Sequence, residues 1–329
     1  MLRFFRSYNS TVIALVFVAG IVSWLHVLGK SDISVSGQYG TFLFQTMSES
    51  FVDTQRQRFG YGLFFFLLTA ILLIFANAQL RLTDKISYLP ALCYVLLTGG
   101  IGEMHRFNPV LVAVILLVVG FILLAKAFES ERLSYSFFTV PAIISFATFF
   151  YQYMYAYMLV VWLVIALLRP GYWREWVFSI LGFAFPLFIA FSWFFLLHDD
   201  YTRTGAFFDE IFSINRATPS LSIPTVVFMT SCILLSVIVF VYTLRYVGSK
   251  KVIFRNRYYV LILIAIVTIA MVALVPDTLP HVWYLLAFPL SFFLSNYLAT
   301  TKSIRWGTIV LSLLFAGVTI VQALFLSTK

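Results

Sequence analysis

Long apolar runs separated by short polar segments follow one another along almost the whole chain. A helix needs about 20 apolar residues to cross a bilayer, and most of these runs come close to that length. Lipid favours helices because a helix satisfies its own backbone hydrogen bonds. The pattern therefore predicts an all-α, polytopic transmembrane helical bundle that forms a single integral membrane domain over residues 1–329. We predict eleven spans, at 11–28, 60–79, 87–102, 108–126, 135–150, 153–168, 176–197, 223–244, 258–275, 282–299 and 306–326.

The least regular part of this pattern is the region 135–168, which is too long for one helix and short for two. The run Tyr151 to Tyr155, with the sequence YQYMY, is polar and aromatic and predicts a tight hairpin between two short helices. The alternative is one long tilted helix, which would give ten spans and reverse the orientation of everything downstream.

The distribution of Lys and Arg favours the hairpin, because cytoplasmic loops of membrane proteins carry an excess of both residues. With eleven spans and a cytoplasmic N-terminus, 15 of the 22 basic residues fall on the cytoplasmic side. Ten spans would move the richest basic loop, Arg245 to Arg257, to the outside. We therefore predict a multi-pass protein of the inner membrane with a cytoplasmic N-terminus and a periplasmic C-terminus.

Composition agrees with a bilayer environment. The chain is 62% hydrophobic and 11% charged, whereas a soluble domain carries about 25% charged residues. The formal net charge is +9, but the Lys and Arg residues are scattered through short loops rather than gathered in one patch. Nucleic acid is therefore excluded as a partner.

The longest break in the apolar pattern is the segment Gly29 to Phe59, which we call the first loop. It lies between the first two predicted spans, on the external side of the membrane. It carries the acids Asp32, Glu49 and Asp53. Its middle part predicts a short helix along the membrane surface, because apolar residues recur there at helical spacing. These residues are Tyr39, Phe42, Leu43, Met47 and Phe51.

Acids and histidines gather on the predicted external side, which places any active or binding site there. The alternative is that acids collect outside simply because cytoplasmic loops are kept basic, since Asp and Glu weigh little in topology. Nine of the 13 acids are external: Asp32, Glu49, Asp53, Glu103, Asp199, Asp200, Asp209, Glu210 and Asp277. The histidines at or near external span ends are His26, His105, His198 and His281.

Two short acidic groups are candidate binding sites. Glu103 and His105 lie two residues apart on an irregular turn, a spacing that suits a shared divalent cation, and Arg106 beside them suits a phosphate. The alternative is an interfacial helix cap with ordinary charge pairing. Asp199 and Asp200 suit a metal or a metal-bound phosphate on a substrate, or they are solvated acids at a helix end. The only candidate cofactor is therefore a divalent cation. The alternative is that the protein has no cofactor.

Signatures of transporters and of soluble enzymes are absent from the sequence. There is no phosphate-binding loop, no H-E-x-x-H, no G-x-S-x-G and no C-x-x-C. No ionisable residue lies near the middle of a predicted span, where ion-coupled transporters place them. Transport is therefore the least supported function.

The order of elements resembles the membrane half of the GT-C superfamily of polyprenyl-phosphate-sugar-dependent glycosyltransferases. In that superfamily a first span leads into a long external loop with juxtamembrane helices, and a second external loop follows between spans three and four. The stretch Phe107 to Trp193 is similar to the superfamily's middle part, with an apolar helix, a charged turn, a hairpin, an Arg-Pro turn and another helix. Residues 281–299, HVWYLLAFPLSFFLSNYLA, also resemble a family of polytopic inner-membrane proteins of Bacteroidota without a settled activity.

The GT-C resemblance implies sugar transfer from a lipid phosphate on the external face of the membrane. It implies that Asp32 is the base, with Glu103 and His105 as metal or base partners. Arg106 would contact the phosphate, and the other implied substrate-binding residues are Tyr39, Asp199 and Asp200.

One departure from the superfamily weakens this reading. GT-C enzymes usually present an acid a few positions before a Tyr at the start of the first-loop helix, but residues 33–38 before Tyr39 contain none. Asp32, seven residues upstream of Tyr39, is the nearest candidate. Two functions therefore stay open: a glycosyltransferase, or a non-catalytic subunit or scaffold of an inner-membrane envelope-assembly or secretion complex. The predicted partners are the lipid bilayer and either a polyprenyl-phosphate-linked substrate or other inner-membrane subunits.

Overall fold

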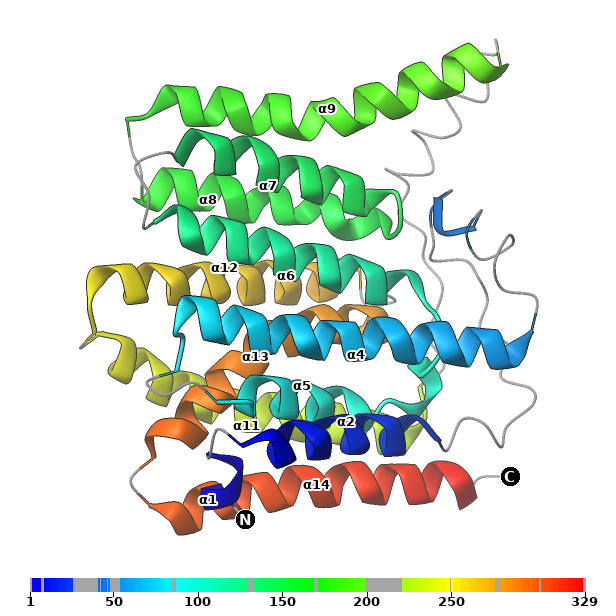
Figure 1. The fold of residues 1–329 in the computed structure, drawn as a ribbon, viewed down its shortest axis with the longest axis vertical. Coiled ribbons are helices and arrows are strands. Elements are labelled where there is room, and N and C mark those ends of the chain that lie inside the picture. The colour runs from blue at the N-terminus through cyan, green and yellow to red at the C-terminus, as the bar shows by residue number, and fades with distance from the viewer. Residues whose placement is uncertain are drawn as a thin grey trace.

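The computed structural model shows only helices, turns and irregular segments in the residues that it describes, and most of the helices lie side by side, roughly parallel or antiparallel (Figure 1). The described residues are 2–6, 9–25, 41, 43–45, 47, 54–83, 87–128, 133–168, 171–198, 221–248, 250–275, 279–301 and 303–327. Within them the α-helices are α1 (Leu2–Phe5), α2 (Ser10–Leu25), α4 (Gln55–Leu80), α5 (Leu89–Gly99), α6 (Pro109–Ala127), α7 (Leu133–Thr148), α8 (Met158–Leu168), α9 (Trp173–His198), α11 (Ile223–Gly248), α12 (Val252–Leu274), α13 (Leu279–Thr300) and α14 (Ile304–Ser327). Two 3-10 segments are η2 (Gly102–Met104) and η3 (Gln152–Tyr157).

The all-helical class predicted from the apolar pattern is confirmed for the described residues, and each predicted span overlaps a helix. Among the described residues, seven helices are long and apolar enough to cross a membrane, namely α4, α6, α9, α11, α12, α13 and α14. The other predicted spans correspond to shorter apolar helices of 10–17 residues. The crossing of the bilayer by all eleven segments therefore stays a prediction.

The predicted break within residues 135–168 is present. α7 ends at Thr148, η3 covers the polar-aromatic run, and α8 starts at Met158. The two helices lie side by side (Figure 1) and contact each other. The Tyr157 hydroxyl of η3 lies 2.8 Å from Thr268 Oγ1 on α12, which ties this break to the rest of the bundle.

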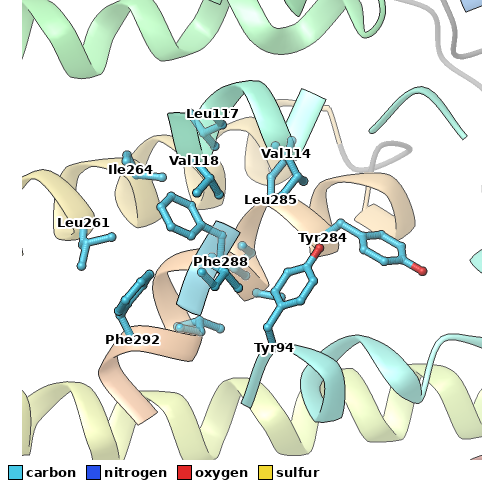
Figure 2. Packing of buried hydrophobic residues seen from close by; sticks show 14 of the residues in the cluster. Tyr94, Val114, Leu117, Val118, Leu261, Ile264, Tyr284, Leu285, Phe288 and Phe292 are labelled. Carbon is cyan, nitrogen blue, oxygen red and sulfur yellow. The ribbon is translucent and has the colours of Figure 1, made fainter. Parts of the chain in front are cut away.

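The core is centred on α5, α6 and α13. Every residue of α5 is buried, and 89% of the most apolar stretch of α13 is buried, against 11% of that of α9. Figure 2 shows Phe288 of α13 among side chains of α5, α6 and α12. Its ring meets Phe121 of α6 edge-on at 5.4 Å. Peripheral helices such as α9 and α11 expose many large apolar side chains, as expected for helices that face lipid.

α9 lies at one edge of the bundle (Figure 1) and contacts α7 and α8. A glycine allows the close approach to α7, because a Cβ atom on Gly182 would collide with the carbonyl group of Phe138. The indole of Trp162 on α8 donates a hydrogen bond to Ser179 Oγ at 3.3 Å. α9 is thus placed by its packing along α7, with one narrow crossing at Gly182, and by a polar contact to α8.

The bundle has two ends, which we name by the connections they carry. The end where Thr41 and residues 101–108 lie is the first-loop end, and the end where α11 turns into α12 is the turn end (Figure 1). At the turn end, Arg257 donates to the Leu80 carbonyl at 2.6 Å and the Tyr258 hydroxyl donates to the Leu82 carbonyl at 2.7 Å. These contacts hold the start of α12 against the end of α4.

Candidate functional site

The segment between α5 and α6 is compact and carries three of the predicted site residues, Glu103, His105 and Arg106. Its backbone folds through η2, with bonds from Met104 N to the Ile101 carbonyl at 3.0 Å and from Arg106 N to the Met104 carbonyl at 2.7 Å. The side chain of Asn108 then caps α6, accepting from Val110 N at 2.9 Å. A polar cap followed by Pro109 is a usual helix start.

His105 is fully buried within the bundle. Its ring stacks on Trp24 of α2 at a centroid distance of 4.9 Å and an interplanar angle of 15°. Its Nε2 lies 3.2 Å from the Thr98 carbonyl oxygen, which can only accept, so Nε2 carries the proton and donates it. This placement favours a structural role, in which His105 joins α2 to the end of α5.

Two substitutions measure the two parts of this structural role. We expect His105→Phe to keep the stacking on Trp24 but to lose the bond to Thr98, lowering the free energy of unfolding by about 1 kcal/mol. His105→Ala also leaves a cavity beside Trp24 and should cost about 3 kcal/mol. Thermal unfolding in detergent would check this order. If both variants unfold like the unsubstituted protein, the ring does not support the fold.

The described part of the first loop packs on the ends of α6 and α7. Thr41 donates from its backbone N to the Phe150 carbonyl at 3.3 Å and from its hydroxyl to the Thr148 carbonyl at 3.0 Å. Phe44 is buried against Val112 and Phe150. Leu43 to Gln45 and Met47 are helical, which agrees with the predicted surface helix. α4 begins at Gln55, so the predicted loop 29–59 ends about one helical turn earlier than its sequence pattern indicates.

An apolar groove of about 460 Å³ lies between this part of the first loop, the start of α4 and Phe107. On α4 the lining residues follow helical spacing, so they form one face of the helix. Phe107 packs against Phe44 at 5.0 Å and against Phe65 at 5.5 Å between ring centroids. The residues that line the groove are Met47, Gln57, Gly60, Tyr61, Phe64, Phe65 and Phe107.

Positive charge flanks the groove. Arg56 and Arg58 lie in the first turn of α4, close to the positive end of its helix dipole. Phe107 N donates to the Arg58 carbonyl at 3.1 Å, which brings Arg106 next to Arg58 along the backbone. Burial and the neighbouring charge of Arg58 lower the pKa of Arg106, but a guanidinium stays protonated at neutral pH. An apolar groove whose lining segments carry the neighbouring arginines Arg58 and Arg106 suits a ligand with a hydrocarbon chain and an anionic head.

The other four predicted site residues lie outside the described residues: Asp32, Tyr39, Asp199 and Asp200. The backbone of Glu103 lies in η2, while its side chain is outside the described part. In the described residues no three His, Cys, Asp or Glu side chains come together in a group that could hold a metal ion. The divalent-cation site at Glu103 and His105 therefore stays a prediction. The structure brings together Met47, which belongs to the predicted surface helix, and Phe107, which follows the predicted phosphate contact Arg106.

The sequence reading missed the face of α4 that lines the groove. Tyr61, Phe64 and Phe65 form an aromatic stripe at helical spacing, directly after the basic pair Arg56 and Arg58. That combination was visible, but such a stripe also suits an ordinary lipid-facing helix end. Only the packing of Met47 and Phe107 on this face turns it into a groove.

Comparison of the chain with known protein families, with curated proteins and with solved structures gives no match.

Proposed function

We propose that this chain is a multi-pass inner-membrane protein with a GT-C-like fold that binds a polyprenyl-phosphate-linked sugar at its first-loop end and transfers the sugar on the external face. The groove beside Arg58 and Arg106 carries this proposal. Its apolar walls suit the prenyl chain, and the two guanidinium groups suit the phosphate. Asp32 is the proposed base, because it is the nearest acid before Tyr39, where the predicted first-loop helix starts.

The alternative is a non-catalytic subunit of an inner-membrane assembly, and His105 supports it. A catalytic base or metal ligand needs access to the substrate. The ring of His105 is instead buried between Trp24 and the end of α5, with Nε2 engaged by Thr98. His105, the predicted partner of Glu103 in metal binding, thus contacts α2 and α5 and supports the fold.

Lipid retention tests the binding step. The full-length protein would be purified in mild detergent, and co-purified polyprenyl phosphate would be quantified by mass spectrometry. A hydrogen bond to a charged group is worth about 1.5–3 kcal/mol, so replacing both arginines, Arg58→Ala with Arg106→Ala, should lower retention at least about tenfold. Gly60→Leu should lower it as well, by placing a side chain in the groove. Gly248→Leu, at a glycine with similarly open surroundings in α11, is the control.

A transfer assay with a radiolabelled sugar donor then separates the two functions. If the chain is a glycosyltransferase, we expect sugar transfer that Asp32→Asn abolishes while lipid retention is unchanged. If it is a non-catalytic subunit, we expect no transfer and a stoichiometric membrane partner in the purified complex. Retention that is equal in the control and in the groove and arginine variants would contradict the proposed site itself.

A further inference from the structure

The turn between α11 and α12 carries a cluster of positive charge. Residues 211–329 contain one acid, Asp277, which belongs to the connection between α12 and α13. The turn end of α11 and α12 carries Arg245, Lys250, Lys251 and Arg255, together with Arg257, which binds the Leu80 carbonyl. The remaining four, which we call the turn cluster, have no acid on either helix to balance them.

The turn cluster is held in place by the backbone and by aromatic rings. Lys250 N donates to the Val247 carbonyl at 3.0 Å, closing the end of α11. Lys250 Nζ lies 4.5 Å from the ring centroid of Tyr246, a cation–π contact. Tyr246 in turn meets Phe254 edge-on at 6.5 Å. The ammonium group of Lys250 therefore lies on a pair of aromatic rings that joins α11 to α12.

The orientation of α12 brings two of these cations onto one face. Arg257 and Tyr258 point toward the end of α4, where they bind the Leu80 and Leu82 carbonyls. Lys251 and Arg255 are four residues apart, so they are neighbours on the helix surface. Arg255 Nε is buried and makes no hydrogen bond to any residue that the structure describes.

This placement is unfavourable within α12 itself. The N-terminus of a helix carries partial positive charge, so acids are stabilising there and cations are not. α12 starts with Lys251 at the N-cap, without a side-chain cap bond, and has no acid in its first turn. Like charges four residues apart repel each other as well. An anion bound at the turn would relieve both costs.

The apolar surroundings identify the anion as part of a lipid. Val252 is 58% exposed and Ile253 is 42% exposed, directly beside Lys251. Both helices are long and apolar enough to span a membrane, so their turn lies where hydrocarbon meets the headgroups. Clusters of about four to eight Lys or Arg next to a span are typical of sites for anionic lipids.

We propose that the turn cluster binds the phosphate headgroup of an anionic phospholipid in the leaflet at the turn end. Lys250, Lys251 and Arg255 contact the phosphate, and the first-turn N–H groups of α12 face it. Arg245, at the end of α11, adds a cation from the other side of the turn. This lipid supplies the negative charge that the sequence of α11 and α12 lacks, and it fixes the depth of the turn in the membrane.

Thermal unfolding of the full-length protein in neutral detergent tests the site. Short-chain phosphatidylglycerol, phosphatidylcholine and inorganic phosphate would each be titrated. We expect phosphatidylglycerol to raise the unfolding temperature and the other two to leave it unchanged. If phosphatidylcholine raises the unfolding temperature as much as phosphatidylglycerol does, the site does not select anionic headgroups. If inorganic phosphate stabilises as much, the ligand is a free anion. Either outcome overturns the proposal.

Matched double variants separate this site from general attraction to the membrane. A hydrogen bond from a charged side chain to the phosphate is worth about tenfold or more in affinity. Lys250→Gln with Lys251→Gln should therefore lower the affinity for phosphatidylglycerol by roughly 100-fold or more. Lys126→Gln with Arg174→Gln removes the same charge at the ends of α6 and α9, outside the proposed site, and should leave the affinity within about twofold of the unsubstituted protein, because exposed charges that do not contact the phosphate are screened. Equal losses in the two double variants would overturn the proposal.

Discussion

Gly182→Ala should push α9 away from α7, at a cost of about 3 kcal/mol, the upper part of the usual range for overpacking. A Cβ atom at this position would lie 2.9 Å from the carbonyl carbon of Phe138 and closer still to its oxygen. These are backbone atoms of α7, which cannot rotate away as a side chain would. α9 must therefore move away from α7, and the hydrogen bond from Trp162 on α8 to Ser179 on α9 lengthens.

Tryptophan fluorescence would follow this change, because α9 carries Trp173, Trp176 and Trp193. The unfolding temperature of the Gly182→Ala variant in detergent should fall by several degrees, with an early transition in the fluorescence of α9. Gly248→Ala is the control, since no atom lies within 4 Å of its Cβ position. Equal unfolding temperatures for the two variants would show that α9 tolerates the shift and that the crossing is not tight.

Gly62→Ala should damage the fold and the groove together. Its Cβ would lie 2.7 Å from the carbonyl carbon of Arg106, from the backbone N of Phe107 and from a ring carbon of Trp24. The segment between η2 and α6 must move off α4, which breaks the bond from Phe107 N to the Arg58 carbonyl. We expect a loss of about 3 kcal/mol in the free energy of unfolding. Because Phe107 forms one wall of the groove, retention of polyprenyl phosphate should fall with it.

Gly60→Ala, two residues away on the same helix, is the matched control. No atom lies within 4 Å of its Cβ position, and Ala is favoured over Gly in a helix by up to about 1 kcal/mol. Its unfolding temperature should equal or exceed that of the unsubstituted protein. The close approach at Gly62 would be refuted if Gly62→Ala and Gly60→Ala had the same unfolding temperature.

The sequence alone determined the helical class and the place of nearly every helix, because the apolar runs of a membrane protein leave few other structures possible. It also located the break at Tyr151 to Tyr155, where polar and aromatic residues interrupt a run that was too long for one helix. Helix ends were less well determined. α4 starts at Gln55 rather than 60, since Thr54 and Gln57 form a capping pair in which Thr54 N donates to Gln57 Oε1 at 2.9 Å.

Tertiary packing decided what the polar residues do. His105 looked like a metal ligand because Glu103 and Arg106 are its neighbours in sequence, but α2 supplies Trp24 to its ring and α5 supplies Thr98 to its Nε2. The groove likewise joins Met47, the α4 face and Phe107, which are far apart along the chain. Periodicity shows which residues share a face of one helix, whereas partners from another helix depend on how the helices pack, and that information is not local in the sequence.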